Sequence, residues 1–328
     1  MEAESRLRLS TVLRYAVCAA ALAWLYHKTD WGQFKQVLVS ADWRLALLAV
    51  LVFGPAVLLI SVRLKVLLAV QRVHLSVWQA VKVTFAGNFV ISALPVGTPG
   101  GDSVKAYYVA RDTPLKHEAV TAVFFDRAVG VLGLLLMAGV IVLVDWDNPA
   151  FKVWGRVIGL LLLVLVAGVG LYASAYVRRA LQLWRVVAIL PLSRHIHRVD
   201  KAIMAFRQDL GRILVSMCLT FVLQTISIAA YFLAGWALGV VGTDPWTAFP
   251  VYLAYTPICL LTGALPIGVM ELTFQELFAG AAGLGSPEAA LSLSFFGRLI
   301  QLIWALPGGL VVLRSRADLE KASLDAAE

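Results

Sequence analysis

The chain has 328 residues, of which 60% are hydrophobic and only 15% are charged, and its mean hydropathy is +0.83. This composition is far too apolar for a soluble globular domain and is typical of a polytopic membrane protein. A net charge of +8 would suit a nucleic-acid-binding protein. The placement of the basic residues along the chain, described below, argues against that class.

Six apolar runs reach the length of about 20 residues that a helix needs to cross a bilayer. They are Leu9–Tyr26, Leu45–Val62, Ala119–Val144, Val153–Val177, Ile213–Leu238 and Glu288–Leu313. No soluble catalytic domain remains once these runs are set aside. We therefore expect an all-α polytopic membrane protein with about six transmembrane helices, forming a single membrane domain over residues 1–328.

Two other segments, Val77–Arg111 and Ala248–Gly283, each have room for two short helices and are interrupted by proline and glycine. Proline removes a backbone donor and glycine permits a reversal of the chain. We therefore predict two re-entrant helical hairpins. Their predicted hinge or tip residues are Pro95, Gly97, Pro99, Pro266 and Gly268. The alternative is a pair of tilted, short full spans in each segment, which preserves the same parity.

The two hairpins belong to stretches that resemble each other at a constant offset of 171 residues. Ala-Leu-Pro-Val-Gly ends at Gly97 and Ala-Leu-Pro-Ile-Gly ends at Gly268, while Phe-Phe-Asp-Arg ends at Arg127 and Phe-Phe-Gly-Arg ends at Arg298. Three expected spans, an odd number, separate the hairpins, so the second would enter from the opposite side. We predict an inverted-topology repeat, approximately 45–144 and 211–313, as in many secondary transporters. Chance similarity among apolar helices is the competing explanation.

The lysines and arginines fall unequally on the two predicted sides of the membrane. With alternating sides, nineteen lie on one side and five on the other. This positive-inside bias predicts a multi-pass membrane protein with both termini cytoplasmic. The net charge is then a topology signal, and we expect no nucleic-acid partner. The basic stretch 178–212 is predicted to be a cytoplasmic amphipathic connector, with a plain cytosolic connector as the alternative.

An arginine stands well inside each of two apolar runs, Arg127 in one and Arg298 in the other. A charge near the membrane centre costs about 3 kcal/mol and is tolerated when it faces a polar cavity or a partner. Because a guanidinium binds phosphate through two parallel hydrogen bonds, we predict that both arginines clamp a phosphate-bearing headgroup. The alternative is structural ion pairing, for instance of Arg298 with Glu271 or of Arg127 with Asp102.

The first hairpin offers glycines and free backbone N–H groups at a helix start, which favours an anion site. Asp102 could instead cap that helix, and Lys105 could reach either a phosphate or the membrane surface. Glu271 and Glu276 would suit a proton-coupled step, a headgroup amine or pairing with Arg298. The predicted substrate-binding residues are Arg63, Asn88, Gly100, Gly101, Asp102, Lys105, Asp126, Arg127, Glu271, Glu276 and Arg298.

Catalytic motifs are missing from the sequence. It contains no Gly-x-Ser-x-Gly, no P-loop, no HExxH and no dinucleotide-binding glycine pattern. The three cysteines, Cys18, Cys218 and Cys259, stand singly in apolar runs and form neither a metal site nor a disulfide framework. We therefore expect a protein that is not an enzyme and that needs no cofactor or metal.

Several motifs together resemble a known family. They are Val62-Arg63-Leu64, Asn88 with Pro95, the run from Gly100 to Ala106, the run from Phe125 to Gly130, and the run from Pro266 to Leu272. The family is the flippase-like transmembrane domain of lysylphosphatidylglycerol synthases, which also occurs as stand-alone proteins. Leu64 replaces the family's usual tryptophan and Lys105 replaces an arginine, and the positive charge is kept. The resemblance covers nearly the whole chain and implies translocation of a lipid between leaflets.

These observations lead to one expected function and two alternatives. We expect a lipid flippase or transporter of the bacterial cytoplasmic (inner) membrane, without ATPase, stand-alone and without a synthase domain. It would move a phospholipid or polyprenyl-type lipid by its phosphate-bearing headgroup through a midplane site. Its partners would be anionic or zwitterionic membrane lipids and a lipid-synthesis enzyme. A non-transporting scaffold that binds anionic lipid or a lipid-modifying enzyme is the alternative, and an integral membrane transferase is the third.

Overall fold

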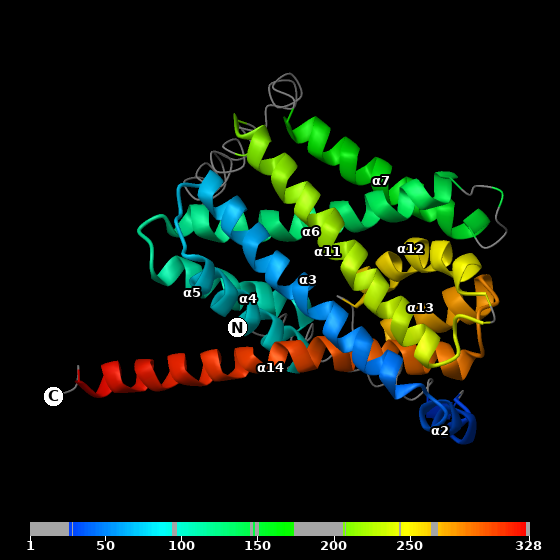
Figure 1. Cartoon of the computed structure of the whole chain (residues 1–328). Helices are drawn as coiled ribbons and strands as arrows, with labels where there is room; N and C mark the ends of the chain where they lie inside the picture. The colour runs from blue at the N-terminus through cyan, green and yellow to red at the C-terminus, as the bar shows by residue number, and fades with distance from the viewer. Residues whose placement is uncertain are drawn as a thin grey trace, which may run out of the picture. The chain divides into compact units, whose positions relative to one another are not determined.

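The computed structural model describes residues 26–27, 29–93, 97–144, 147, 151–173, 206, 208–242, 244–263 and 268–325. Within these residues all regular structure is helical, as the sequence predicts (Figure 1). The predicted first span, most of the predicted 178–212 connector and the hinge residues Pro95 and Pro266 lie outside the described residues.

Among the residues that the structure describes, four helices are long and apolar enough to cross a membrane. They are α3 (Trp43–Val70), α6 (Lys116–Val144), α11 (Leu210–Ala237) and α14 (Pro287–Asp325), the last over its part Pro287–Arg314. They match four of the six predicted spans. A helix satisfies its own backbone N–H and C=O groups, which is what a segment inside a bilayer requires.

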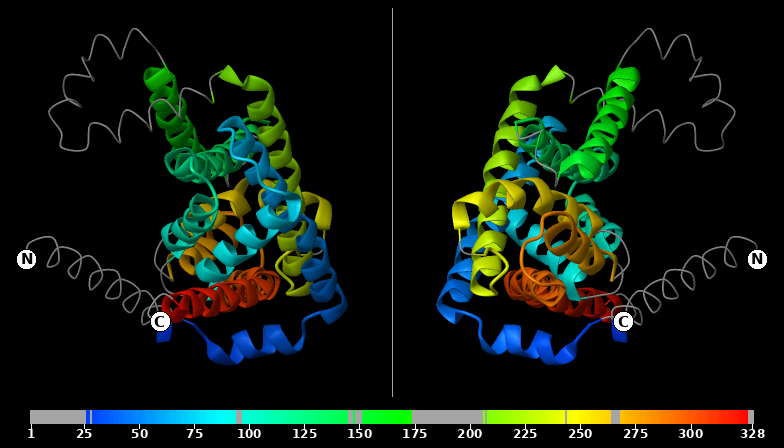
Figure 2. Two further views of the ribbon diagram at one scale, coloured as in Figure 1. Left: turned by 90° about the vertical axis from the view of Figure 1, so that its left-hand side faces the viewer. Right: turned by 90° about the vertical axis from the view of Figure 1, so that its right-hand side faces the viewer.

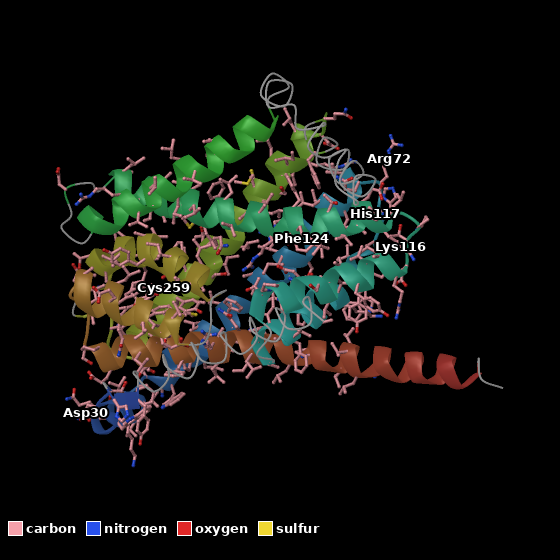
Figure 3. All side chains as sticks on the ribbon, turned by 180° about the vertical axis from the view of Figure 1, so that it is seen from behind. Asp30, Arg72, Lys116, His117, Phe124 and Cys259 are labelled. Atoms are coloured by element: carbon pink, nitrogen blue, oxygen red, sulfur yellow. The ribbon has the colours of Figure 1, made fainter. Side chains whose placement is uncertain are left out.

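α7 (Phe151–Ala173), a helix of 23 residues, overlaps the predicted fourth span, Val153–Val177. α2 (Trp31–Val39) was not predicted, and Asp30, labelled in Figure 3, caps it by accepting from the backbone N–H groups of Gln33 (3.1 Å) and Gly32 (2.9 Å). These two hydrogen bonds hold the pKa of the Asp30 carboxyl below its ordinary value.

The first predicted hairpin is a pair of packed helices, α4 (Val77–Ala93) and α5 (Gly97–Arg111). The two helices lie side by side because glycines permit a close approach (Figure 1). A side chain at Gly101 would collide with Ile91 and with the carbonyl oxygen of Gly87. Pro99 lies in the first turn of α5, where a missing N–H leaves no intrahelical bond unmade.

The second predicted hairpin consists of α12 (Pro245–Thr262) and α13 (Val269–Phe274), which continues as the π-helix η1 (Gln275–Ala281). The rings of Tyr252 and Phe278 hold its two arms together, with their centroids 4.7 Å apart. Gly268 precedes α13 with φ of +104°, in the region that only glycine adopts without strain. Figure 2 shows both hairpins, cyan and yellow-orange, from two further directions.

The order of helices in the first half recurs in the second. A long helix, a two-helix hairpin and another long helix make up both α3 to α6 and α11 to α14. The chain also divides into two compact units. Unit 1 consists of Met1–Phe53, Met137–Arg156 and Thr225–Gln301, and unit 2 consists of Gly54–Leu136, Val157–Gln224 and Leu302–Glu328. Each unit holds one of the two hairpins.

Candidate functional site

Five charged side chains gather inside unit 2. Arg63 comes from α3, Asp102 and Lys105 come from α5, and Asp126 and Arg127 come from α6. All except Arg127 are more than nine-tenths buried. A buried charge is costly unless it is paired and hydrogen-bonded. We call these five residues the charged cluster. What the cluster can bind depends on how each of its charges is already paired.

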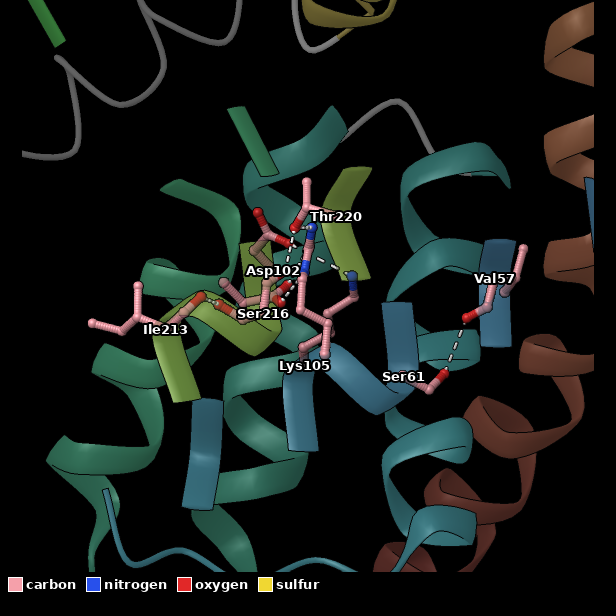
Figure 4. Close-up of polar contacts among 9 residues, drawn as sticks. Val57, Ser61, Asp102, Lys105, Ile213, Ser216 and Thr220 are labelled. Carbon is pink, nitrogen blue, oxygen red and sulfur yellow. Dashed lines mark hydrogen bonds and ion pairs between the residues drawn. The ribbon is translucent and has the colours of Figure 1, made fainter. Parts of the chain in front are cut away.

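Arg63 and Asp126 form a two-pronged ion pair. Nε of Arg63 donates to Oδ1 of Asp126 at 2.7 Å, and Nη2 donates to Oδ2 at 3.0 Å. Nη1 donates to Oγ1 of Thr220 at 3.2 Å, and this hydroxyl donates to the carbonyl of Ser216 at 2.7 Å (Figure 4). A Cβ at Gly130 would lie 3.3 Å from Nη1 of Arg63. These contacts hold the Arg63–Asp126 pair in place, so the pair is the rigid part of the cluster.

Asp102 lies between two cations without a hydrogen bond to either. Its Oδ1 is 3.8 Å from Nζ of Lys105, and its Oδ2 is 3.9 Å from Nε of Arg127. Both distances exceed hydrogen-bond length, so the attraction is Coulombic alone. Figure 4 draws Asp102 and Lys105 among the polar contacts of this region. The aliphatic stem of Lys105 lies against Gly87, where a side chain would displace it.

Arg127 is the member of the cluster that a ligand can reach. Its side chain is 43% exposed, and its Nη2 donates to Oγ1 of Thr98 at 3.3 Å, in the first turn of α5. Its other N–H groups make no hydrogen bond to the described residues. Three cations and two carboxylates leave the cluster with one net positive charge. This arrangement attracts an anion and leaves guanidinium donors for it.

Unit 1 holds a second, smaller site around Glu271 and Arg298. Glu271 is fully buried, and its Oε1 accepts from Nε of Arg298 at 2.5 Å. Its Oε2 accepts from the backbone N–H of Gly268 at 2.8 Å and, more weakly, from Nη2 of Arg298 at 3.4 Å. The Arg298 side chain is 32% exposed. One carboxylate therefore binds both the arginine and the start of α13, and the pair is electrically neutral.

An uncharged pair stands beside this site in unit 1. Gln301 donates from Nε2 to the hydroxyl of Tyr231 at 2.9 Å. The ring of Tyr231 lies against Gly297, where a side chain would collide with it. Gly297 follows Asp126 by 171 residues, the offset of the predicted repeat. The segment predicted as the second copy therefore has glycine and an aromatic contact where the first has Asp126 and its pair with Arg63.

Both predicted ion pairs occur. Arg298 and Glu271 form a direct one, whereas Arg127 and Asp102 are within ion-pair distance but not hydrogen-bonded. The alternative that Asp102 caps its helix is wrong, because α5 begins five residues earlier, at Gly97. Asp102 lies in the second turn, where its carboxylate faces α6.

Other predicted residues stand apart from these contacts. Glu276 lies on η1 and is exposed, with no ion pair to a described residue. Asn88 is half-buried on α4 and makes no hydrogen bond to a described residue. Gly100 is half-buried in the first turn of α5, and Gly101 serves the packing of α5 on α4.

Sequence reasoning missed four polar residues that complete the two sites, namely Thr98, Thr220, Tyr231 and Gln301. A signal existed for two of them. Gln301 follows Arg298 by three residues, and Thr220 follows Ser216 by four, so each pair lies on one helix face. Polar residues three or four positions apart in an apolar helix indicate a polar face of that helix. The sequence around Tyr231 offers no comparable signal.

Comparison with known protein families places this geometry in context. Residues 11–309 match the family described as the lysylphosphatidylglycerol synthase TM region. The chain belongs to this family. The resemblance seen in its motifs is thereby confirmed, over nearly the whole sequence. A search of curated proteins gives no match. Family membership and the four apolar helices together make this chain a membrane protein of a family linked to lipid synthesis.

Proposed function

We propose that this protein moves a lipid with a phosphate-bearing headgroup between the leaflets of a bacterial cytoplasmic membrane. The observation that carries the proposal is Arg127, a partly exposed guanidinium inside an apolar helix and part of the charged cluster, whose net charge is positive. An exposed arginine at membrane depth is costly without an anionic partner. A headgroup phosphate supplies that partner and accepts two parallel hydrogen bonds from the guanidinium.

The positions of the two arginines within their helices support the proposal that both lie at the same depth in the membrane. Arg127 follows the first residue of α6, Lys116, by eleven positions, and Arg298 follows the first residue of α14, Pro287, by the same number. Eleven residues correspond to about 16 Å of helix. That is roughly half of a hydrocarbon core about 30 Å thick. We infer that both arginines serve headgroups near the membrane midplane.

The repeated order of helices supports an alternating-access route. In this proposal the α4–α5 hairpin and the hairpin of α12, α13 and η1 are re-entrant, and they enter from opposite sides. α6, α7 and α11 cross the membrane between them, so the two copies form an inverted repeat. Both termini are cytoplasmic. The lipid's headgroup passes the arginines, its acyl chains stay in the bilayer, and no covalent chemistry is required.

Reconstitution into liposomes tests this function. A fluorescent phosphatidylglycerol in the inner leaflet becomes accessible to an external quencher only when it is moved. We expect wild-type protein to expose it, and Arg127→Ala and Arg298→Ala to lower the rate at least tenfold. Arg44→Ala, which removes an exposed arginine at the start of α3, is the matched control and should keep the wild-type rate.

Two results would count against the proposal in different ways. If folded Arg127→Ala and Arg298→Ala proteins flip lipid at the wild-type rate, these two arginines do not form the headgroup site. Wild-type protein that binds lipid but moves none of the labelled lipids would favour the scaffold alternative.

A further inference from the structure

We propose that Asp102 sets the charge of the headgroup that the charged cluster accepts. It makes the cluster select singly charged phosphodiesters over doubly charged phosphomonoesters. The inference rests on the proposed function, because it concerns the same cluster, but it assigns to one residue a selectivity that transport alone does not require.

The geometry makes Asp102 an internal anion. Its carboxylate lies 3.8 Å from Nζ of Lys105 and 3.9 Å from Nε of Arg127, whose side chain is 43% exposed. Neither cation donates a hydrogen bond to it. Lys105 likewise donates none to any described residue, and its side chain is 7% exposed. A phosphate bound to the exposed Arg127 therefore meets Asp102 and Lys105 as neighbouring buried charges, while the carboxylate stays in place.

The second carboxylate of the cluster cannot take this role. Asp126 already accepts two hydrogen bonds from Arg63, and Arg63 is fixed further by Thr220. That pair is neutral by itself. The charge that a ligand meets is therefore the sum of Lys105, Arg127 and Asp102, which is one positive charge.

The sign and size of this charge determine the preferred headgroup. A phosphodiester carries one negative charge and neutralises the cluster on binding. A doubly charged phosphomonoester leaves one negative charge uncompensated in a region of low dielectric, where charge imbalance is costly. Replacement of Asp102 by asparagine raises the local charge to two, and the doubly charged headgroup then becomes the balanced one.

The test measures binding of two lipids that share their acyl chains. Dioleoylphosphatidylglycerol is the phosphodiester probe and dioleoylphosphatidic acid the phosphomonoester probe. Each is added to the full-length protein in lipid nanodiscs at about pH 8.5, where the phosphomonoester carries close to two charges. We expect wild type to prefer the phosphodiester by roughly tenfold and Asp102→Asn to prefer the phosphomonoester. Asp102→Glu, which keeps the charge, should restore the wild-type order.

A matched control carries the same chemical change outside the cluster. Asp112 forms an exposed ion pair with Arg111 at the end of α5, at 3.2 Å. Asp112→Asn should keep the wild-type preference. Thermal unfolding of each variant checks that the fold is kept.

The outcomes separate this inference from the proposed function. Folded Asp102→Asn protein with the wild-type preference overturns the inference, whether or not lipid is moved. Wild type that shows the preference but moves no lipid supports the charge selection and contradicts transport. If Asp102→Asn does not fold, Lys105→Gln replaces it, since it takes the local charge to zero. We then expect phosphodiester binding to weaken about tenfold, and unchanged binding overturns the inference.

Discussion

Arg63 and Asp126 meet through two parallel hydrogen bonds inside unit 2, although 63 residues separate them in the sequence. Both side chains are more than nine-tenths buried. This geometry is the strongest form of a carboxylate–guanidinium contact. It ties α3 to α6 next to Arg127 and so fixes the helix that carries the reachable guanidinium.

Breaking this pair from one side should be costly. Arg63→Met leaves the Asp126 carboxylate unpaired, and Asp126→Leu leaves the guanidinium unpaired, so each should lower the free energy of unfolding by about 3–5 kcal/mol. The double variant leaves no unpaired charge and should recover most of that loss. Chemical unfolding in detergent measures all three. Additive losses in the double variant would contradict the pairing.

Glu271 should be the more sensitive of the two glutamates in the second hairpin. Glu271→Ala leaves Arg298 and the Gly268 N–H without their acceptor, and we expect a loss of about 3–5 kcal/mol in the free energy of unfolding. Glu271→Gln retains one acceptor oxygen and should lose less. Glu276→Ala, at an exposed position of η1, should stay within about 0.5 kcal/mol of wild type. Equal losses at both positions would disprove the assigned role of Glu271.

Two glycines with different surroundings should respond in opposite ways to replacement by alanine. Gly101→Ala places a methyl group against Ile91 and the Gly87 carbonyl, and should destabilise the protein by about 1–3 kcal/mol. Gly159 lies within α7 with no atom within 4 Å of an added Cβ, so Gly159→Ala should be neutral or stabilise by up to about 1 kcal/mol. Thermal unfolding of the two variants side by side is the measurement. A destabilised Gly159→Ala would refute the packing explanation.

Arg72 offers a site for stabilisation. It follows the C-terminus of α3 with φ of +58°, and the next residue, Val73, donates its N–H to the carbonyl of Leu68 at 3.1 Å. This is the glycine-favouring end of a helix. Arg72→Gly should raise the free energy of unfolding by about 1 kcal/mol, and Arg72→Ala should not. The unfolding midpoints of the two variants test this prediction. An equal gain in stability from Arg72→Ala would exclude backbone strain as the cause.

The long helices and the hairpins were predictable because apolar length, proline and glycine act locally. The runs that became α3, α6, α11 and α14 are long enough to be recognised by hydropathy alone. α2 was missed because nine residues are too few for such a window, although Asp30 offered a capping signal. The ion pairs of Arg127 and Arg298 were anticipated as alternatives to headgroup binding, since a charge at that depth requires a partner.

What the sequence could not predict depends on three-dimensional contacts and helical phase. Nothing in the spacing of Arg63 and Asp126 indicates that the two side chains bind each other. Glu276 aligns with Lys105 in the predicted repeat, yet Lys105 is buried and Glu276 is exposed. Lys105 lies in the regular α-helix α5, whereas Glu276 is the second residue of the π-helix η1.

The unbalanced charge of the cluster has an electrical consequence for the proposed transport. A singly charged headgroup cancels it, so the loaded protein is electroneutral and the empty protein carries one charge. Membrane voltage acts on a charge with at most about 2.3 kcal/mol per 100 mV. It therefore drives the return of the empty protein and leaves the lipid-carrying step untouched. Because each full cycle carries the single negative charge of the headgroup across the membrane, voltage and the lipid gradient together would set the direction of transport.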